Sequence, residues 1–358
     1  MSRIFNFSAG PAVLPLEVLE EAQRELVDCQ KSGMSIMEMS HRGKVYDAVH
    51  QEAQANLREL LKLPEDFEVL LLQGGASMQF ATIPMNFLGQ GQTADYVNSG
   101  AWGAAAIKQA RLLGNVNVCA DCEKDLPTRV PLQSELKLTP GAAYFHYTTN
   151  ETISGAQWKT LPKVEAPMIA DMSSDILSRP IDMAPFSLAY AGAQKNLGPS
   201  GVTVVLIRKS FAERSNKAIP AIFRYPTHIE AQSLYNTPPC FGIYILMHVT
   251  RWVKRTGLER LWKQNADKAA LLYTAIDASD FYRGTASEEC RSDMNVTFRL
   301  PTAELEAEFC SAAKKEGLDG LKGHRSVGGV RASIYNAFPV EGVTTLVQFM
   351  REFERVHG

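Results

Sequence analysis

The run Val69-Leu70-Leu71-Leu72-Gln73-Gly74-Gly75-Ala76-Ser77, followed by the largely apolar stretch 78–88, decides the fold class of this chain. The four apolar residues 69–72 predict a buried strand, and the glycine pair predicts the turn that ends it. The stretch 78–88 predicts a helix that is broken near Pro84, because proline removes a backbone hydrogen bond. A buried strand that leads through a turn into a helix is the repeating unit of α/β proteins.

The same unit recurs along the chain without an internal sequence repeat. Further strands are predicted at 94–97, 143–147, 168–170, 188–192 and 202–207, and helices at 102–113 and 242–255. Beyond them, a helix is predicted at 258–278, an alternating stretch at 294–298, helices near 302–316 and 341–356, and a strand near 329–333. We therefore predict a large domain over 17–255 and a smaller α+β domain formed by 256–358 together with the N-terminal segment 1–16.

The composition is typical of a globular protein. Apolar residues make up 45% of the 358 residues and charged residues 21%, which argues against disordered and fibrous proteins. The 37 basic and 39 acidic side chains give a net charge of −2, so no overall field attracts nucleic acid or anionic lipid. No apolar run approaches the roughly 20 residues that span a bilayer, and the N-terminus lacks a signal-peptide core, so we predict a cytoplasmic protein.

The six cysteines are scattered through the chain, and we expect free thiols because a domain of this size needs no disulfide framework. Cys119 and Cys122 form a lone C-x-x-C without a second pair or nearby histidines. That context favours an ordinary structural role over metal binding or redox chemistry. No metal site is expected.

Two features indicate a site at the ends of the predicted strands, where ligands of open α/β sheets bind. Gly74-Gly75-Ala76-Ser77 opens a helix, and free amides at a helix N-terminus bind phosphate, although an ordinary turn explains the glycines equally simply. Lys195 follows the strand 188–192 among small residues that leave room for a planar group. Burial would lower the pKa of its amine and make it a Schiff-base nucleophile, whereas a solvated turn lysine is the alternative.

Two further residues fall at the same predicted edge. Asp171 ends the apolar strand 168–170, and its carboxylate is suited to pair with a protonated pyridine nitrogen. The alternative is that Asp171 caps a helix that starts near Ser173. Trp102 opens a helix and offers a flat surface for stacking on a cofactor ring, although simple filling of the core explains an isolated tryptophan as well.

Basic residues occur in pairs among glycines. The pairs are His41-Arg42 and His324-Arg325, and Arg331 follows the second pair after a glycine-rich loop. Arginine forks are suited to bidentate binding of carboxylate or phosphate. A solvated charged face is the alternative, but the glycine-rich stretch 322–329 is a loop rather than a helix face, which favours substrate binding.

Several motifs, in this order, resemble those of the phosphoserine aminotransferases, which are class V aminotransferases of pyridoxal-phosphate fold type I. The motifs are the stretches 7–15 (FSAGPAVLP), 40–44 (SHRGK), 150–153 (NETI), 170–174 (ADMSS), 190–196 (YAGAQKN), 235–239 (YNTPP), 322–325 (KGHR) and 331–336 (RASIYN). The resemblance covers essentially the whole chain. Single motifs are shared with many fold-type I enzymes, whereas the full set is highly specific.

The resemblance implies a large α/β domain with a mainly parallel seven-stranded sheet flanked by helices, and pyridoxal 5'-phosphate as the cofactor. It implies that Lys195 binds the cofactor as an imine, Asp171 pairs with its pyridine nitrogen, Trp102 stacks on the ring and Thr152 contacts the phenolic oxygen. Phosphate ligands are implied at Ala76, Ser77 and Gln194, and at Asn236 and Thr237 of the second subunit of a homodimer.

The resemblance also implies a reaction. The amino group of L-glutamate would pass reversibly to 3-phosphohydroxypyruvate, giving O-phospho-L-serine and 2-oxoglutarate, as in serine biosynthesis. Substrate carboxylate would be held by Arg42 and Arg331, and substrate phosphate by His41, His324 and Arg325, partly across the dimer interface. The resemblance leaves open whether 4-phosphohydroxy-L-threonine of pyridoxine biosynthesis is a second substrate.

Two departures from the family pattern qualify these implications. Ala76-Ser77 replaces the Gly-Arg or Gly-Cys of some relatives, so the side chain of Ser77 is an uncertain ligand while the backbone amides remain available. Ala9 stands where some relatives have serine, and it is left out of the predicted site. The alternatives are an aminotransferase for unphosphorylated substrates, a cysteine desulfurase, or a non-catalytic protein that binds phosphorylated ligands.

Overall fold

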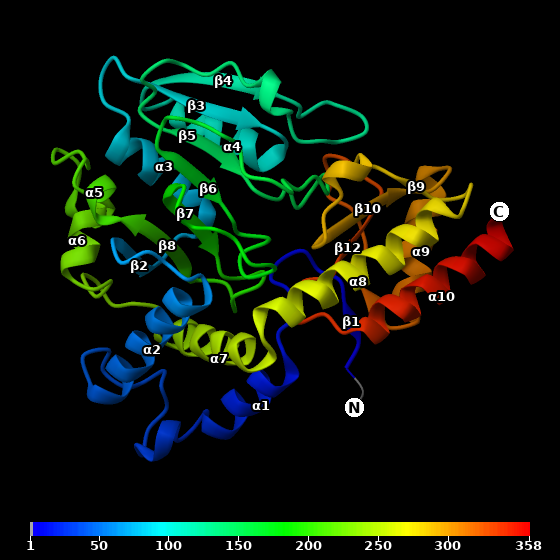
Figure 1. Ribbon diagram of the computed structural model, residues 1–358. Helices are drawn as coiled ribbons and strands as arrows, with labels where there is room; N and C mark the ends of the chain where they lie inside the picture. The colour runs from blue at the N-terminus through cyan, green and yellow to red at the C-terminus, as the bar shows by residue number, and fades with distance from the viewer. Residues whose placement is uncertain (1–2) are drawn as a thin grey trace.

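The computed structural model describes residues 3–358, and a seven-stranded sheet forms its centre (Figure 1). The strands lie in the order β2-β8-β7-β6-β5-β3-β4, with the bounds β2 Phe67–Leu72, β3 Thr93–Asn98, β4 Asn115–Asp121, β5 Phe145–Thr148, β6 Met168–Asp171, β7 Phe186–Gly192 and β8 Thr203–Arg208. β8 is antiparallel to both of its neighbours, whereas β4, β3, β5, β6 and β7 pair in parallel. The predicted mainly parallel sheet is confirmed.

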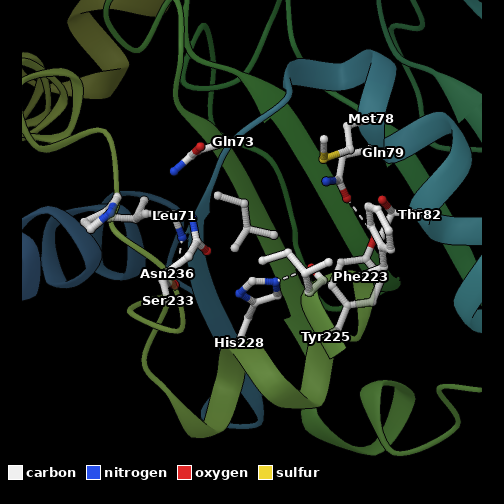
Figure 2. Close-up of a pocket in the computed structure, with 13 residues that line it drawn as sticks. Leu71, Gln73, Met78, Gln79, Thr82, Phe223, Tyr225, His228, Ser233 and Asn236 are labelled. Atoms are coloured by element: carbon white, nitrogen blue, oxygen red, sulfur yellow. Dashed lines mark hydrogen bonds between the residues drawn. The ribbon is translucent and has the colours of Figure 1, made fainter. Parts of the chain in front are cut away.

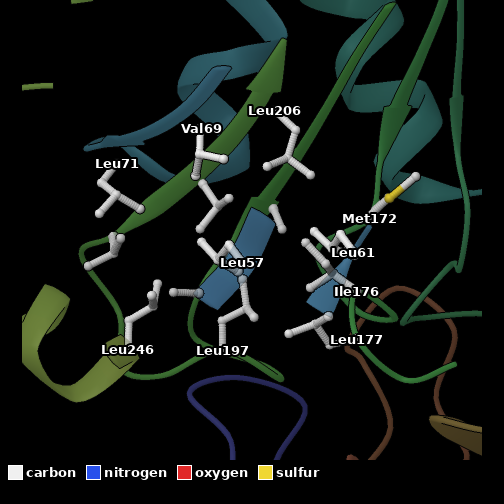
Figure 3. Close-up of a cluster of buried hydrophobic side chains, with 14 of the residues drawn as sticks. Leu57, Leu61, Val69, Leu71, Met172, Ile176, Leu177, Leu197, Leu206 and Leu246 are labelled. Atoms are coloured by element: carbon white, nitrogen blue, oxygen red, sulfur yellow. The ribbon is translucent and has the colours of Figure 1, made fainter. Parts of the chain in front are cut away.

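Helices cover both faces of this sheet. They are α1 Leu16–Glu25, α2 Lys44–Leu60, α3 Gly75–Phe87, α4 Ala101–Ala110, α5 Lys209–Ala212, α6 Tyr225–Glu230 and α7 Cys240–Thr256, with short 3-10 turns η1 Cys29–Lys31, η2 Gln133–Glu135 and η3 Ala221–Phe223. Side chains alternate along β8, so that Val204 and Leu206 pack towards α2 and α7 (Figure 3), while Val205 and Ile207 pack towards α3 and α4. Because both faces are buried, the strands are continuously apolar instead of alternating with polar residues.

The C-terminal part has its own core. It contains α8 Leu258–Asp277, α9 Ala303–Lys315, α10 Val340–His357, the 3-10 turn η4 Glu288–Cys290 and a three-stranded sheet of β9 Arg283–Gly284, β10 Asn295–Arg299 and β12 Val330–Ser333. The short N-terminal strand β1 Phe5–Asn6 pairs in parallel with β11 Leu318–Asp319, and Phe7 joins the apolar cluster beneath. The division into domains at 17–255 and 256–358 stays a prediction, and the main apolar clusters lie largely on either side of it.

Several predicted boundaries are wrong in detail. The helix after the first glycine turn begins at Gly75 instead of residue 78 and runs unbroken through Pro84, which is buried between Phe80 and Phe87. Burial of this apolar turn compensates for the backbone hydrogen bond that proline cannot donate. The predicted helices 242–255 and 258–278 are found within two residues of their predicted bounds, as α7 and α8, and Gly257 with φ +88° separates them. The helices α1 and α2 and the edge strand β4 were not predicted.

The carboxyl ends of five strands lie at one edge of the sheet, because β3, β5, β6 and β7 are parallel to one another and β2, antiparallel to β8, runs in their direction. β2 leads into α3, β3 leads into α4, and β5, β6 and β7 end at Thr148, Asp171 and Gly192. Residues separated by more than a hundred positions therefore meet at this edge. Within residues 3–358, no helix combines the length and the apolar character needed to cross a bilayer.

We expect Leu206→Ala to lower the free energy of unfolding by about 2–5 kcal/mol, because it leaves a cavity in a fully buried position of β8. Urea denaturation at a fixed protein concentration measures the loss. The matched control is Leu112→Ala, at a leucine that is 75% exposed, which should change stability by less than about 0.5 kcal/mol. Equal losses in the two variants would contradict the described core.

Candidate active site

Lys195 lies three residues beyond the end of β7, with its amine inside the protein. The side chain is 8% exposed, and its Nζ donates a hydrogen bond of 2.5 Å to Thr152 Oγ1. The same nitrogen lies 5.6 Å from the centre of the Trp102 ring. The solvated alternative for this lysine is therefore wrong, and three predicted site residues meet around one amine.

Asp171 ends β6 and faces the same space. Its Oδ1 accepts hydrogen bonds from the backbone N–H of Ser173 (2.9 Å) and from the Ser173 hydroxyl (2.6 Å). The Ser173 oxygen in turn accepts the N–H of Gly192 at 3.0 Å. No helix begins directly after Asp171, so the alternative role of Asp171 as a helix N-cap is wrong. Among residues 3–358 no hydrogen bond reaches Oδ2, which leaves that oxygen available to a ligand.

A cavity of about 100 Å³ joins these groups. Its lining residues are Gly75, Ala76, Ser77, Trp102, Thr148, Asn150, Asp171, Ser173, Ser174, Gln194 and Lys195. The start of α3 lines this cavity, where the first amides of the helix have no partner within the helix and Gly74 adopts φ +88°. Lys195 and Asp171 line the cavity as well. Helix-start amides that suit an anion, an amine and a carboxylate thus share one cavity.

The side chains around this cavity fit pyridoxal phosphate. The helix start suits its phosphate, the flat face of Trp102 suits its ring, and Asp171 suits a protonated ring nitrogen. Thr148 Oγ1 and Trp102 Nε1 are buried without a hydrogen-bond partner among the described residues. Buried polar atoms normally have partners, so these two orphans indicate a polar ligand in the cavity.

The predicted basic residues lie outside this cavity. Arg331 on β12 is the nearest, and its Nη1 donates to Thr152 O at 3.4 Å. It lines a second, larger cavity of about 850 Å³ together with Arg299, Lys124 and the glycines of the loop 323–328. His324 and Arg325 belong to that loop, and His324 Nδ1 lies 2.7 Å from Ser326 Oγ.

The remaining predicted residues are not brought into the cavity by this one chain. His41 and Arg42 precede α2, and Arg42 is exposed. Asn236 and Thr237 lie on an exposed loop, where Thr237 O accepts a hydrogen bond of 2.9 Å from Gln73 Nε2. Asn236 lines a separate cavity of about 220 Å³ that Figure 2 shows beside the start of α3.

Comparison with known proteins agrees with this geometry. The profile of the family described as aminotransferase class-V matches residues 4–346. A phosphoserine aminotransferase of Niallia circulans is 57% identical over 359 residues, which cover 99% of each chain. The chain belongs to the phosphoserine aminotransferase family.

Solved structures of the family have the same fold. A phosphoserine aminotransferase from Bacillus circulans subsp. alkalophilus superposes with a TM-score of 0.97 at 57% identity and covers 99% of each chain. The PLP-bound phosphoserine aminotransferase from Trichomonas vaginalis gives a TM-score of 0.94 at 41% identity, covering 98% of this chain and 100% of that one. The resemblance read from the motifs is confirmed.

Three buried polar residues at the site went unrecognised in the sequence. Glu151, at zero exposure, accepts the backbone N–H groups of Trp102 and Gly103. Ser173 connects Asp171 with Gly192, and Asn150 donates to Ser174 Oγ at 2.8 Å. Their one signal was membership of the quoted family motifs 150–153 and 170–174, because burial of a polar residue in a loop leaves no periodic pattern in the sequence.

Burial sets the charge of the central groups. It lowers the pKa of Lys195 to about 8, although the Asp171 and Glu151 carboxylates oppose the change. Burial raises the pKa of Asp171, while its hydrogen bonds with Ser173 and the Lys195 ammonium oppose this. A lysine with a lowered pKa presents a larger fraction of neutral, nucleophilic amine near neutral pH than an ordinary lysine does.

We expect the apo-protein to bind pyridoxal phosphate covalently about tenfold faster per pH unit up to pH 8, with a plateau above it. The rate should rise with pH because the pKa of Lys195 is lowered, so that the amine becomes neutral as the pH rises through about 8. Stopped-flow absorbance at constant ionic strength measures the rate, and Lys195→Ala serves as the blank. A binding rate that continues to rise tenfold per pH unit up to pH 10 would show that the amine is not desolvated.

Proposed function

We propose that this chain transfers the amino group of L-glutamate to 3-phosphohydroxypyruvate, giving O-phospho-L-serine and 2-oxoglutarate in serine biosynthesis. One observation carries the proposal: the Lys195 amine, the free oxygen of Asp171 and the start of α3 line a single buried cavity. The full-length similarity to phosphoserine aminotransferases supports the choice of substrates.

The cavity residues divide the binding of pyridoxal phosphate among them. The amides of Ala76 and Ser77 and the Gln194 side chain would hold the phosphate, since all three line the cavity at the start of α3. Asp171 would keep the ring nitrogen protonated, and Thr152 would contact the phenolic oxygen. When bound, the cofactor supplies an electron sink for the charge left when the bond between the α-carbon and its hydrogen breaks.

Lys195 would move the proton between substrate and cofactor. Its neutral Nζ would accept the proton from the α-carbon of glutamate and, as the conjugate acid, would give that proton up again within the same site. The hydrogen bond to Thr152 Oγ1 holds this nitrogen near the Trp102 ring. With the keto acid as acceptor, the same amine performs the steps in reverse order.

Substrate recognition would fall to the basic residues around the larger cavity. Arg331 reaches the cavity and, with Arg42, would hold the substrate carboxylate. His41, His324 and Arg325 would hold the phosphate, or the side-chain carboxylate of glutamate. Because this group of cations suits phosphate, the proposal includes 4-phosphohydroxy-L-threonine of pyridoxine biosynthesis as a second substrate.

We further propose a homodimer with shared active sites. The support is that four of the proposed residues, His41, Arg42, Asn236 and Thr237, line neither the cavity of Lys195 nor the larger cavity of Arg331 in the same chain. Asn236 and Thr237 are exposed, so a partner chain can reach or supply them. A cytoplasmic location completes the proposal, and the free state of all six cysteines agrees with a reducing compartment.

The substrate assignment is tested by comparing amino acceptors. With glutamate as donor, we expect kcat/KM for 3-phosphohydroxypyruvate to exceed those for pyruvate and glyoxylate by at least about a hundredfold, because charge-assisted hydrogen bonds to phosphate are lost with the smaller acids. Coupled assay of 2-oxoglutarate measures the rates. A preference for an unphosphorylated acceptor would overturn the assignment, and borohydride reduction that leaves Lys195 unmodified would overturn the cofactor site.

Shared active sites are tested by mixing two inactive variants, Lys195→Ala and Arg42→Ala. If Arg42 serves the partner's site, each mixed dimer has one intact site, and random exchange of equal amounts should restore about a quarter of the original activity. The control pair is Lys195→Ala with Arg331→Ala, whose residues serve the same site in one chain and should restore none. Equal recovery in both mixtures, or in neither, would contradict the sharing.

A further inference from the structure

Helix α4, which carries Trp102, begins without a capping side chain of its own. Its N-cap residue is Gly100, which has no side chain to accept the free amides of the first turn. Glu151 takes that place from a different part of the chain. Its Oε2 accepts the N–H of Trp102 at 3.2 Å, and its Oε1 accepts the N–H of Gly103 at 3.0 Å.

The start of the helix is shaped around this carboxylate. A Cβ atom added at Gly100 would lie 2.7 Å from Glu151 Cδ and 2.8 Å from its Oε2. One added at Gly103 would lie 2.8 Å from Val97 O. A larger residue at Gly100 would collide with the fully buried Glu151, whereas a larger residue at Gly103 would collide with the β3 backbone. Gly100 therefore allows the helix to approach the carboxylate, and Gly103 allows it to approach the sheet.

The backbone of Glu151 is held as firmly as its side chain. Its N–H donates to Ala156 O at 2.8 Å, and its carbonyl oxygen accepts the N–H of Gly155 at 2.9 Å. On one side, Asn150 Nδ2 donates to Ser174 Oγ and to Asn295 Oδ1, each at 2.8 Å. The carboxylate therefore projects from an anchored loop and has little freedom to follow a shifted helix.

The same loop contacts both Lys195 and Trp102, which line the cavity. Thr152, the next residue, bonds the Lys195 amine, while Glu151 bonds the backbone of Trp102 itself. The distance of 5.6 Å between Lys195 Nζ and the Trp102 ring is thus set by two adjacent residues. Movement of α4 away from the loop would separate the ring from the amine.

We propose that Glu151 is a positioning residue that fixes the Trp102 ring for stacking on the cofactor, without touching the cofactor itself. This inference rests on the proposed function of the cavity. Only a carboxylate accepts from both amides at once, because glutamine of the same shape would turn an N–H donor towards one of them. Burial raises the pKa of Glu151 to about 7, and the hydrogen bonds from the Gly103 and Trp102 amides, at the positive end of the helix dipole, oppose this rise.

The first test compares Glu151→Gln with Asp95→Asn. Asp95 is a fully buried carboxylate on β3 that accepts Asn117 Nδ2 at 2.9 Å and the Thr139 N–H at 2.8 Å, with no contact to Trp102. We expect both variants to lower the Tm of the apo-protein, and only Glu151→Gln to weaken pyridoxal phosphate binding, by about tenfold. It should also reduce the visible circular dichroism of the bound cofactor.

The second test asks whether the effect passes through Trp102. In a double-mutant cycle with Trp102→Phe, the loss of cofactor affinity caused by Glu151→Gln should largely disappear in the Trp102→Phe background. Full additivity would overturn the proposal, as would Glu151→Gln with unchanged affinity and dichroism. If Glu151→Gln does not fold, Glu151→Asp, which keeps the charge and shortens the reach, replaces it in the same cycle.

A wild-type protein that binds no pyridoxal phosphate would refute the proposed function, not this inference. In that case the tryptophan fluorescence of the apo-protein still decides whether Glu151 positions Trp102. A Glu151→Gln spectrum that differs from wild type, with a difference that vanishes in the Trp102→Phe background, supports positioning. An unchanged spectrum overturns it.

Discussion

The whole candidate site depends on the desolvation of the Lys195 ammonium group. A lysine at 8% exposure, with a threonine hydroxyl as its direct hydrogen-bond partner, holds its charge only with difficulty, and burial dominates its lowered pKa. The carboxylates of Asp171 and Glu151 limit that effect, so the amine titrates near neutrality instead of remaining permanently neutral. The surrounding structure maintains this balance between burial, which lowers the pKa of Lys195, and the two carboxylates, which raise it.

The parallel strands bring these opposing groups close to Lys195. Each strand ends at the same edge, and the polar residues that follow β5, β6 and β7 are brought together although 43 positions separate Thr152 from Lys195. Their hydrogen bonds form a connected set, in which Ser173 links Asp171 to the backbone before Lys195. A carboxylate held in this way keeps one oxygen for its structural bonds and one for a ligand.

Sequence alone predicts what is periodic or placed at strand ends. The sheet, Asp171 and Lys195 were predicted because apolar runs mark strands and polar residues mark where they stop. The predicted break at Pro84 is wrong because this part of the helix is buried, with Phe80, Ile83 and Phe87 in one apolar cluster, and that burial outweighs the helix-breaking tendency of proline. Glu151 was overlooked because its role depends on a helix that begins 50 positions earlier, and no local pattern records that contact. The assignment of Asn236 and Thr237 came from the family resemblance alone, because the local sequence pattern around them does not indicate a ligand.

The pairing of β1 with β11 has a consequence for the order of events in the cell. Residues 5–6 leave the ribosome long before their strand partners at 318–319 are made. The segment between β1 and α1 lies beside Lys195, where the N–H of Ala12 donates to Gln194 O. Synthesis of the central sheet therefore does not complete the surroundings of Lys195, because the covering segment is fixed only after β11 has been made.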